Sequence, residues 1–134
     1  LIAIEDPLRP EAAPVIRKLL GRGIRVVMLT GDDERTAAAV AERLGISEYR
    51  SQVLPTDKAE VIREAFARLA LEEADKPLTA MIGDRKHDIV GAKKNGIASV
   101  GVAFGYAEEG ELEEAGADRI VASVSALRKL LLAW

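Results

Sequence analysis

Two aspartates four residues apart are the positions of this sequence best suited to chemistry. Asp84 follows a short apolar run closed by Gly83, and Asp88 stands four residues further on, before a helical pattern over residues 89–94. An apolar run closed by glycine is typical of a buried strand that leads into a loop. Carboxylates at the carboxyl end of a parallel strand lie where ligands bind, and their oxygens suit Mg²⁺. The spacing alone fits equally well a helix-capping aspartate beside a solvated one.

Two other residues could hold a phosphoryl group, one at the end of an expected strand and one at the start of an expected helix. Thr30 ends the apolar run 25–29, and its hydroxyl and the Gly31 amide are suitable donors to a phosphate oxygen. Lys58 stands at the start of a later helical pattern, where its ammonium would face the same crevice. A hydroxyl donor, a lysine and a Mg²⁺ site together can hold a phosphoryl group and stabilise its charge. Each of these features alone is common in structural loops.

The elements that carry these residues alternate between strands and helices. We expect strands at residues 1–5, 25–30, 49–54, 80–83 and 98–103, with a sixth, edge strand at 118–122. Helical patterns occupy residues 10–20, 37–44, 57–69, 89–94, 108–115 and 125–132, with Thr56 as the expected cap of the third. Strict alternation predicts an α/β fold, a three-layer sandwich with a Rossmann-like parallel sheet. Residues 1–134 contain no internal repeat and no linker, so we expect one domain.

Composition excludes several classes of function. The chain is 49% hydrophobic and 31% charged, with a net charge of −3 and its positive residues spread along it, so nucleic acid is not an expected partner. It has no cysteine and one histidine, which excludes thiolate and histidine-rich metal sites. No apolar run approaches a membrane span and nothing resembles a signal peptide, so a cytoplasmic location is the default expectation. Because the sequence opens on Leu1, we expect a fragment, a processed product or an engineered protein.

The order of these motifs resembles the haloacid dehalogenase (HAD) superfamily. Residues 1–62, with IEDPLRPEA, VVMLTGD and VLPTDKAEVI, resemble the phosphorylation domain of metal-transporting P-type ATPases. Residues 56–132, with MIGDRKHDIVGAKKNGI and VGVAFGYAEEGEL, resemble phosphoglycolate-phosphatase-type hydrolases. The resemblance assigns phosphate binding to Thr30 and Lys58 and the acidic Mg²⁺ pair to Asp84 and Asp88. Asp32 matches the last residue of the ATPase TGD motif.

Two departures from the family pattern qualify this resemblance. The ATPase motif continues as GDGxND, whereas this chain reads GDRKHD, so it looks like a junction of two subfamilies between Pro55 and Pro77, and an engineered chimera is one interpretation. The family's nucleophile is the first Asp of a DxD or DKTGT segment, and neither DxDGT nor DKTGT occurs here. The cap or nucleotide-binding insert that would select a substrate is also missing.

The missing nucleophile strand leads to a prediction about strand order. In the family that strand is central, and its absence would leave two unpaired strand edges inside the sheet. We therefore expect residues 1–5 to occupy the central place, which gives the order 3-2-1-4-5 when strands are numbered along the chain. Asp6 would then stand near the carboxyl edge as a possible third Mg²⁺ ligand, with Lys86 and His87 in solvent.

Three functions are compatible with these residues. The first is a HAD-like core that binds phosphate or a small phosphorylated ligand and Mg²⁺ weakly, with little or no phosphatase activity because it lacks the phosphoryl acceptor. The second is a working phosphatase in which Asp6 or Glu5 replaces the nucleophile. The third is a non-catalytic engineered scaffold or binding module in which the strand-end residues are relics.

Overall fold

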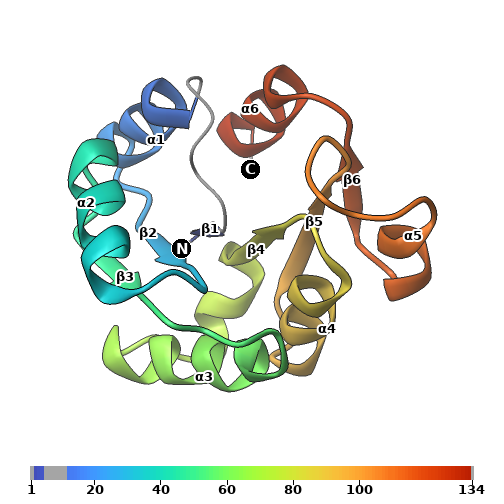
Figure 1. Ribbon diagram of the computed structural model, residues 1–134, viewed down its shortest axis with the longest axis horizontal. Coiled ribbons are helices and arrows are strands. Elements are labelled where there is room, and N and C mark those ends of the chain that lie inside the picture. Colours follow the sequence, from blue (N-terminus) through green and yellow to red (C-terminus); the bar gives the residue numbers. More distant parts are fainter. Residues whose placement is uncertain (1, 5–11, 134) are drawn as a thin grey trace.

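A six-stranded parallel sheet organises the chain (Figure 1). The computed structural model describes residues 2–4 and 12–133, and of residues 2–4 it describes the backbone. The strands are β1 (Ile2–Ile4), β2 (Val26–Leu29), β3 (Glu48–Arg50), β4 (Ala80–Gly83), β5 (Ala98–Val102) and β6 (Arg119–Val121). The helices are α1 (Ala12–Gly21), α2 (Glu34–Leu44), α3 (Lys58–Arg68), α4 (Lys86–Lys94), α5 (Glu111–Ala115) and α6 (Val124–Leu132). Two short 3₁₀ turns, η1 (Pro55–Asp57) and η2 (Glu73–Leu78), precede α3 and β4.

The strand order is β3-β2-β1-β4-β5-β6, which confirms the predicted order, the central place of the first strand and the sixth edge strand. Ile4 of β1 stands opposite Met28 of β2 on one side and Ile82 of β4 on the other. The backbone groups of β1 are thus paired on both sides, which removes the cost of two open edges inside the sheet. All pairs are parallel, so the carboxyl ends of all six strands lie at one edge.

Helices cover both faces of the sheet and make the predicted three layers. Helices α1, α2 and α6 lie on one face, and α3 and α4 lie on the other (Figure 1). The strands alternate between the two cores: Met28 and Ile82 face the first group of helices, whereas Leu29 and Met81 face the second. A parallel sheet covered on both faces needs apolar residues on both, which is why β2 and β4 are buried along their whole length.

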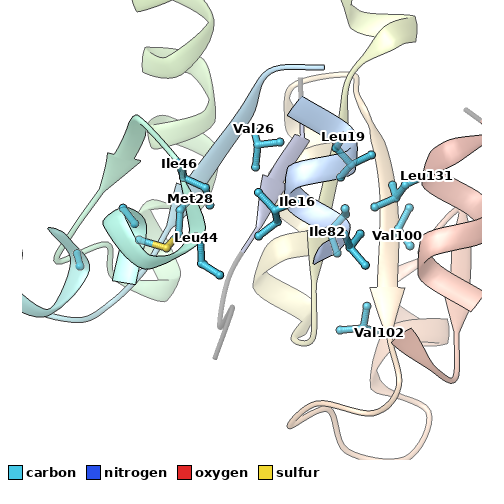
Figure 2. Packing of buried hydrophobic residues seen from close by; sticks show 13 residues of the cluster. Ile16, Leu19, Val26, Met28, Leu44, Ile46, Ile82, Val100, Val102 and Leu131 are labelled. Carbon is cyan, nitrogen blue, oxygen red and sulfur yellow. The ribbon is translucent and has the colours of Figure 1, made fainter. Parts of the chain in front are cut away.

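The larger core lies between α1, α6 and the sheet (Figure 2). Ile16 and Leu19 of α1 and Leu131 of α6 are at most 2% exposed and pack over Ile82 and Val100. A leucine buried to this degree contributes about 2–5 kcal/mol relative to alanine. This core makes the sheet a rigid support for the residues at its carboxyl edge.

Two local predictions were wrong, and both concern the segment between β2 and α3. The third strand was expected at residues 49–54 but covers Glu48–Arg50, because the chain turns away at Gln52, whose φ is +54°. Thr56 was expected to cap the next helix. It lies instead inside η1, and no side chain caps η1 or α3. The chain enters α3 through this 3₁₀ turn, which removes the need for a cap at Thr56.

The remaining helices occur near their predicted positions. Helix α4 begins at Lys86 rather than Ile89, so Asp88 lies within its first turn. The polar segment before β4 forms η2, and α5 is shorter than expected. Within the described part of the chain, no helix is long and apolar enough to cross a membrane.

Candidate functional site at the carboxyl edge of the sheet

Polar residues from four different parts of the chain are buried at the carboxyl edge of the sheet. Thr30 follows β2, Asp84 follows β4, and Lys58 and Asp88 lie in the first turns of α3 and α4. Their exposed fractions are 7%, 7%, 3% and 0% for Thr30, Asp84, Lys58 and Asp88. Burying a charged group is costly unless it is paired and hydrogen-bonded. The ion pair and hydrogen bonds that compensate for this cost also fix the positions of the four side chains.

Lys58 and Asp88 form a buried ion pair. The Nζ atom of Lys58 lies 2.7 Å from Oδ1 of Asp88, and the side chains are 4% and 0% exposed. Helices α3 and α4 come close enough for this because Gly91 has no side chain: a Cβ there would lie 3.1 Å from Cβ of Lys58. The side-chain amide of Asn95 donates to the carbonyls of Ala59 and Gly91, at 2.8 and 2.9 Å, and holds the two helices in register.

The second oxygen of Asp88 is also bonded. Oδ2 accepts a hydrogen bond from the backbone N–H of Arg85 at 3.2 Å, which ties the first turn of α4 to the end of β4. The carboxylate lies directly against Gly83, where an added Cβ would be 2.2 Å from Cγ of Asp88. Glycine before Asp84 is therefore required by the packing of Asp88. Each carboxylate oxygen has two lone pairs, so Asp88 keeps acceptor capacity beyond these two bonds.

Asp84 is held by the loop after β5. Its Oδ2 accepts from the backbone N–H of Tyr106 at 2.9 Å, and a Cβ at Gly105 would lie 2.4 Å from Cβ of Asp84. None of the described residues donates to Oδ1 of Asp84. Asp84 thus has one oxygen fixed by the backbone and one that accepts no hydrogen bond from the described residues.

Thr30 is oriented by its own loop. Its Oγ1 accepts from the backbone N–H of Asp32 at 3.1 Å, so the hydroxyl hydrogen remains available to donate. The carbonyl of Thr30 accepts from Val53 N–H at 2.9 Å, and that of Asp32 from Gln52 N–H at 2.8 Å. These bonds between the loops after β2 and β3 account for the left-handed backbone of Gln52.

Asp32, which the resemblance matched to the ATPase motif, lies in the loop after β2 at the same edge of the sheet. The side chain of Asp32 is exposed, and Asp33 rather than Asp32 caps α2 through the N–H of Thr36, which lowers the pKa of Asp33. No group of three or more acidic, histidine or cysteine side chains that could hold a metal occurs in residues 12–133. Asp6 and Glu5 lie outside the described residues. The expected location of Lys86 in solvent is confirmed, whereas His87 is half-buried.

The donor set nevertheless fits Mg²⁺. This ion takes one or two carboxylates and fills its remaining positions with water and phosphate oxygens. Asp84 and Asp88 supply such a pair, on adjacent elements and with their orientation fixed by backbone N–H groups. Gly31 follows Thr30 and is exposed at the same edge, so its amide remains a candidate phosphate donor.

Several residues of the site were not identified from the sequence. They are Gly83, Gly91, Gly105, Asn95, Tyr106 and Glu111. Asn95 directly follows the helical pattern expected over residues 89–94, and Glu111 lies within the one expected over residues 108–115. Glu111 in fact accepts hydrogen bonds from Nε of Arg85 at 2.8 Å, from Lys86 N–H at 2.9 Å and from Glu108 N–H at 2.9 Å. No local pattern indicates such partners, because Arg85 and Lys86 are 26 and 25 residues away.

Comparison with known proteins decides the family. The model of a family described as haloacid dehalogenase-like hydrolase matches residues 1–96. The chain belongs to the haloacid dehalogenase-like hydrolases. It is 42% identical over 108 residues to the zinc-exporting P-type ATPase of Mycobacterium marinum and to the manganese-exporting P-type ATPase of Mycobacterium bovis. These matches cover 80% of this chain but 13% and 14% of the relatives, so the chain spans a small part of their length.

Solved structures of phosphatases share the fold of this haloacid dehalogenase-like chain. A predicted phosphatase from Clostridium acetobutylicum is 30% identical, with a TM-score of 0.79 over 93% of this chain and 60% of that one. The 3-deoxy-D-manno-octulosonate 8-phosphate phosphatase of Moraxella catarrhalis, solved with magnesium and phosphate ions, is 20% identical. Its TM-score is 0.74 over 98% of this chain and 84% of that one, which shows the common fold.

The ATPase and phosphatase likenesses overlap along the chain. A match of 108 residues is too long for either side of a junction between Pro55 and Pro77. The ATPase likeness therefore extends beyond residues 1–62, where the motifs alone had placed it. The chimeric origin stays a prediction.

Proposed function

We propose that this chain is a phosphate- and Mg²⁺-binding core of the haloacid dehalogenase type with little or no phosphatase turnover. One observation carries the proposal: Lys58 and Asp88 form a buried ion pair at the same sheet edge as Thr30 and Asp84. A buried pair of this kind is seldom the most stable choice for a core, because apolar residues of equal volume often do as well or better. A role in binding charged ligands gives a reason for its presence.

Each residue has a definite part in this proposal. The Thr30 hydroxyl and the Gly31 amide donate to phosphate oxygens, and the Lys58 ammonium balances the negative charge of the phosphate and of Asp88. Asp84 and Asp88 hold the metal, which when bound would offset charge on the phosphoryl oxygens. Because the donors are preorganised by the backbone, they need little rearrangement on binding.

Transfer of the phosphoryl group to the protein would need a carboxylate placed in line with phosphorus. The motif that supplies it in the resembled family is absent from this sequence, which supports weak or absent turnover. A small phosphorylated ligand, rather than a macromolecule, is the expected partner, since the site lies at the edge of one small sheet.

A calorimetric titration of Mg²⁺, with and without inorganic phosphate, tests this proposal. We expect a weak Mg²⁺ site in the parent that Asp84→Asn removes. The matched control is Asp57→Asn, which removes the same charge from an exposed residue close to Lys58 and should leave the site intact. Equal Mg²⁺ binding by the parent and Asp84→Asn would contradict the proposed site.

A second candidate is an active phosphatase that uses Asp6 or Glu5. It is favoured by the central position of β1, because Asp6 follows Ile4 by two residues, just as Thr30 and Asp84 follow Met28 and Ile82 in the paired strands. A Mg²⁺-dependent assay on an aryl phosphate separates the two candidates. Turnover that Asp6→Asn and Asp84→Asn both abolish supports the second, and no turnover in the parent supports the first.

A further inference from the structure

Glu111 joins the two loops that hold the candidate metal ligands. Its side chain is 9% exposed, and both of its oxygens accept hydrogen bonds. Oε1 accepts from Nε of Arg85 and from the N–H of Lys86, at the junction of β4 and α4. Oε2 accepts from the N–H of Glu108, in the loop after β5. One carboxylate on α5 therefore connects the loop that contains Asp84 with the loop that binds it.

The donors around Glu111 are close neighbours of the groups that fix the aspartates. Arg85, whose side chain Glu111 binds, donates its own N–H to Asp88. Tyr106, in the same loop as Glu108, donates its N–H to Asp84. A change at Glu111 would thus alter the position of Asp88 through Arg85, and that of Asp84 through the loop that contains Glu108 and Tyr106.

Arg85 is the reason that this contact matters for the charge of the site. It is directly adjacent to Asp84, and its side chain is 44% exposed and held only at its Nε atom by Glu111 among the described residues. Released from Glu111, this cation would compete with a metal ion for the carboxylates.

We propose that Glu111 is a positioning residue for the metal site, which holds the guanidinium of Arg85 away from Asp84 and Asp88. The inference rests on the proposed Mg²⁺ site and assigns a role to a residue outside it. Outer partners that orient metal ligands typically change metal affinity about 10–100-fold when they are replaced. Glu111 differs from such a partner because it acts by keeping a competing cation paired.

Calorimetric Mg²⁺ titrations of single and double variants test this role. We expect Glu111→Gln to weaken Mg²⁺ binding about ten-fold or more. Glu113→Gln, an exposed glutamate of the same helix, makes the same change of charge and should bind as the parent does. The double variant Glu111→Gln with Arg85→Gln should recover most of the lost affinity, because the competing cation is gone. Loss of a merely structural contact would not be repaired by a second truncation.

Three results would overturn the proposal. The first is that Glu111→Gln binds Mg²⁺ with the same affinity as Glu113→Gln. The second is that the double variant binds Mg²⁺ no more tightly than Glu111→Gln alone. Ser99→Ala, which removes hydrogen bonds to Asp118 at the far end of β5, controls for lost stability and should leave Mg²⁺ affinity unchanged. If it weakens Mg²⁺ binding as much as Glu111→Gln does, the effect is one of stability and the proposal fails.

Failure of the Mg²⁺ site itself would be visible as absence of binding in the parent. In that case amide hydrogen exchange of the metal-free protein still tests the position of the loop. Faster exchange of the Tyr106 N–H in Glu111→Gln than in Glu113→Gln supports the positioning role. Equal exchange rates overturn it, independently of any metal.

Discussion

Nζ of Lys58 lies 2.7 Å from Oδ1 of Asp88, although the two residues are 30 positions apart and both side chains are almost fully buried. The pair connects α3 with α4, and it joins a candidate phosphate-binding residue to a candidate metal ligand. Its energetic and functional roles can be separated, because removal of one partner leaves a buried charge, whereas removal of both does not.

Lys58→Met should lower the free energy of unfolding by about 3–5 kcal/mol, because Asp88 then remains as an unpaired buried carboxylate. The double variant Lys58→Met with Asp88→Leu should recover most of this loss, although neither variant should bind phosphate. Urea denaturation measures the effect, with Lys94→Met on the exposed side of α4 as the control for loss of a lysine. A stability loss in Lys58→Met no larger than in the control would show that the pair contributes nothing.

Gly83→Ala should destabilise the protein and disturb Asp88, since its Cβ would fall 2.2 Å from Cγ of that residue. Overpacking of this kind typically costs about 1–3 kcal/mol. Gly21→Ala is the matched substitution, because nothing lies within 4 Å of its Cβ and the residue ends α1. It should instead stabilise by about 0.5–1 kcal/mol. Thermal melts of both variants check the opposite signs, and a neutral Gly83→Ala would contradict the close approach of Asp88.

Acid should remove a part of the stability that depends on Glu111. Hydrogen bonds from Arg85 first, and then from the N–H groups of Lys86 and Glu108, lower the pKa of Glu111 from 4.5 to about 2. A carboxyl with a lowered native pKa stabilises the fold fully above its unfolded value and loses that contribution as pH falls towards the native one. The window is therefore pH 4.5 to about 2.

The corresponding measurement is the melting temperature as a function of pH. As the pH is lowered from 4.5 to about 2, the melting temperature of Glu111→Gln should decrease less steeply than that of the parent, because the variant has no carboxylate at position 111 to protonate. Glu113→Gln should retain the slope of the parent. Parallel curves for the parent and Glu111→Gln would indicate that the hydrogen bonds of Glu111 are not formed in solution.

Mg²⁺ should raise the melting temperature more than NaCl of equal ionic strength. A ligand at about ten times its Kd stabilises the native state by roughly 1.4 kcal/mol, which corresponds to a few degrees for a domain of this size. Asp84→Asn should abolish the response, and Asp57→Asn should keep it. A Mg²⁺ shift that survives in Asp84→Asn would place the ion elsewhere.

The sequence alone determined the fold class, the strand order and most of the candidate ligands. Apolar runs closed by glycine or aspartate located β2 and β4. Because these strands are short, the polar residues that follow them could be placed at the carboxyl edge of the sheet from the sequence. The central place of β1 followed from the cost of unpaired strand edges. The fold class depends on periodicity, which a single chain carries locally. The strand order and the roles of the candidate ligands depended also on the resemblance to the haloacid dehalogenase superfamily.

Only the tertiary structure decided which of these residues contact one another. The Lys58–Asp88 pair, the hydrogen bond from Tyr106 to Asp84 and the contacts of Glu111 with Arg85 and Lys86 join residues 22–30 positions apart. The need for glycine at positions 83 and 105 became visible only in the structure, where aspartate side chains pack against both residues. The physical reason is that a buried charge takes its partners from whichever elements the sheet brings alongside it, and no local pattern records that choice.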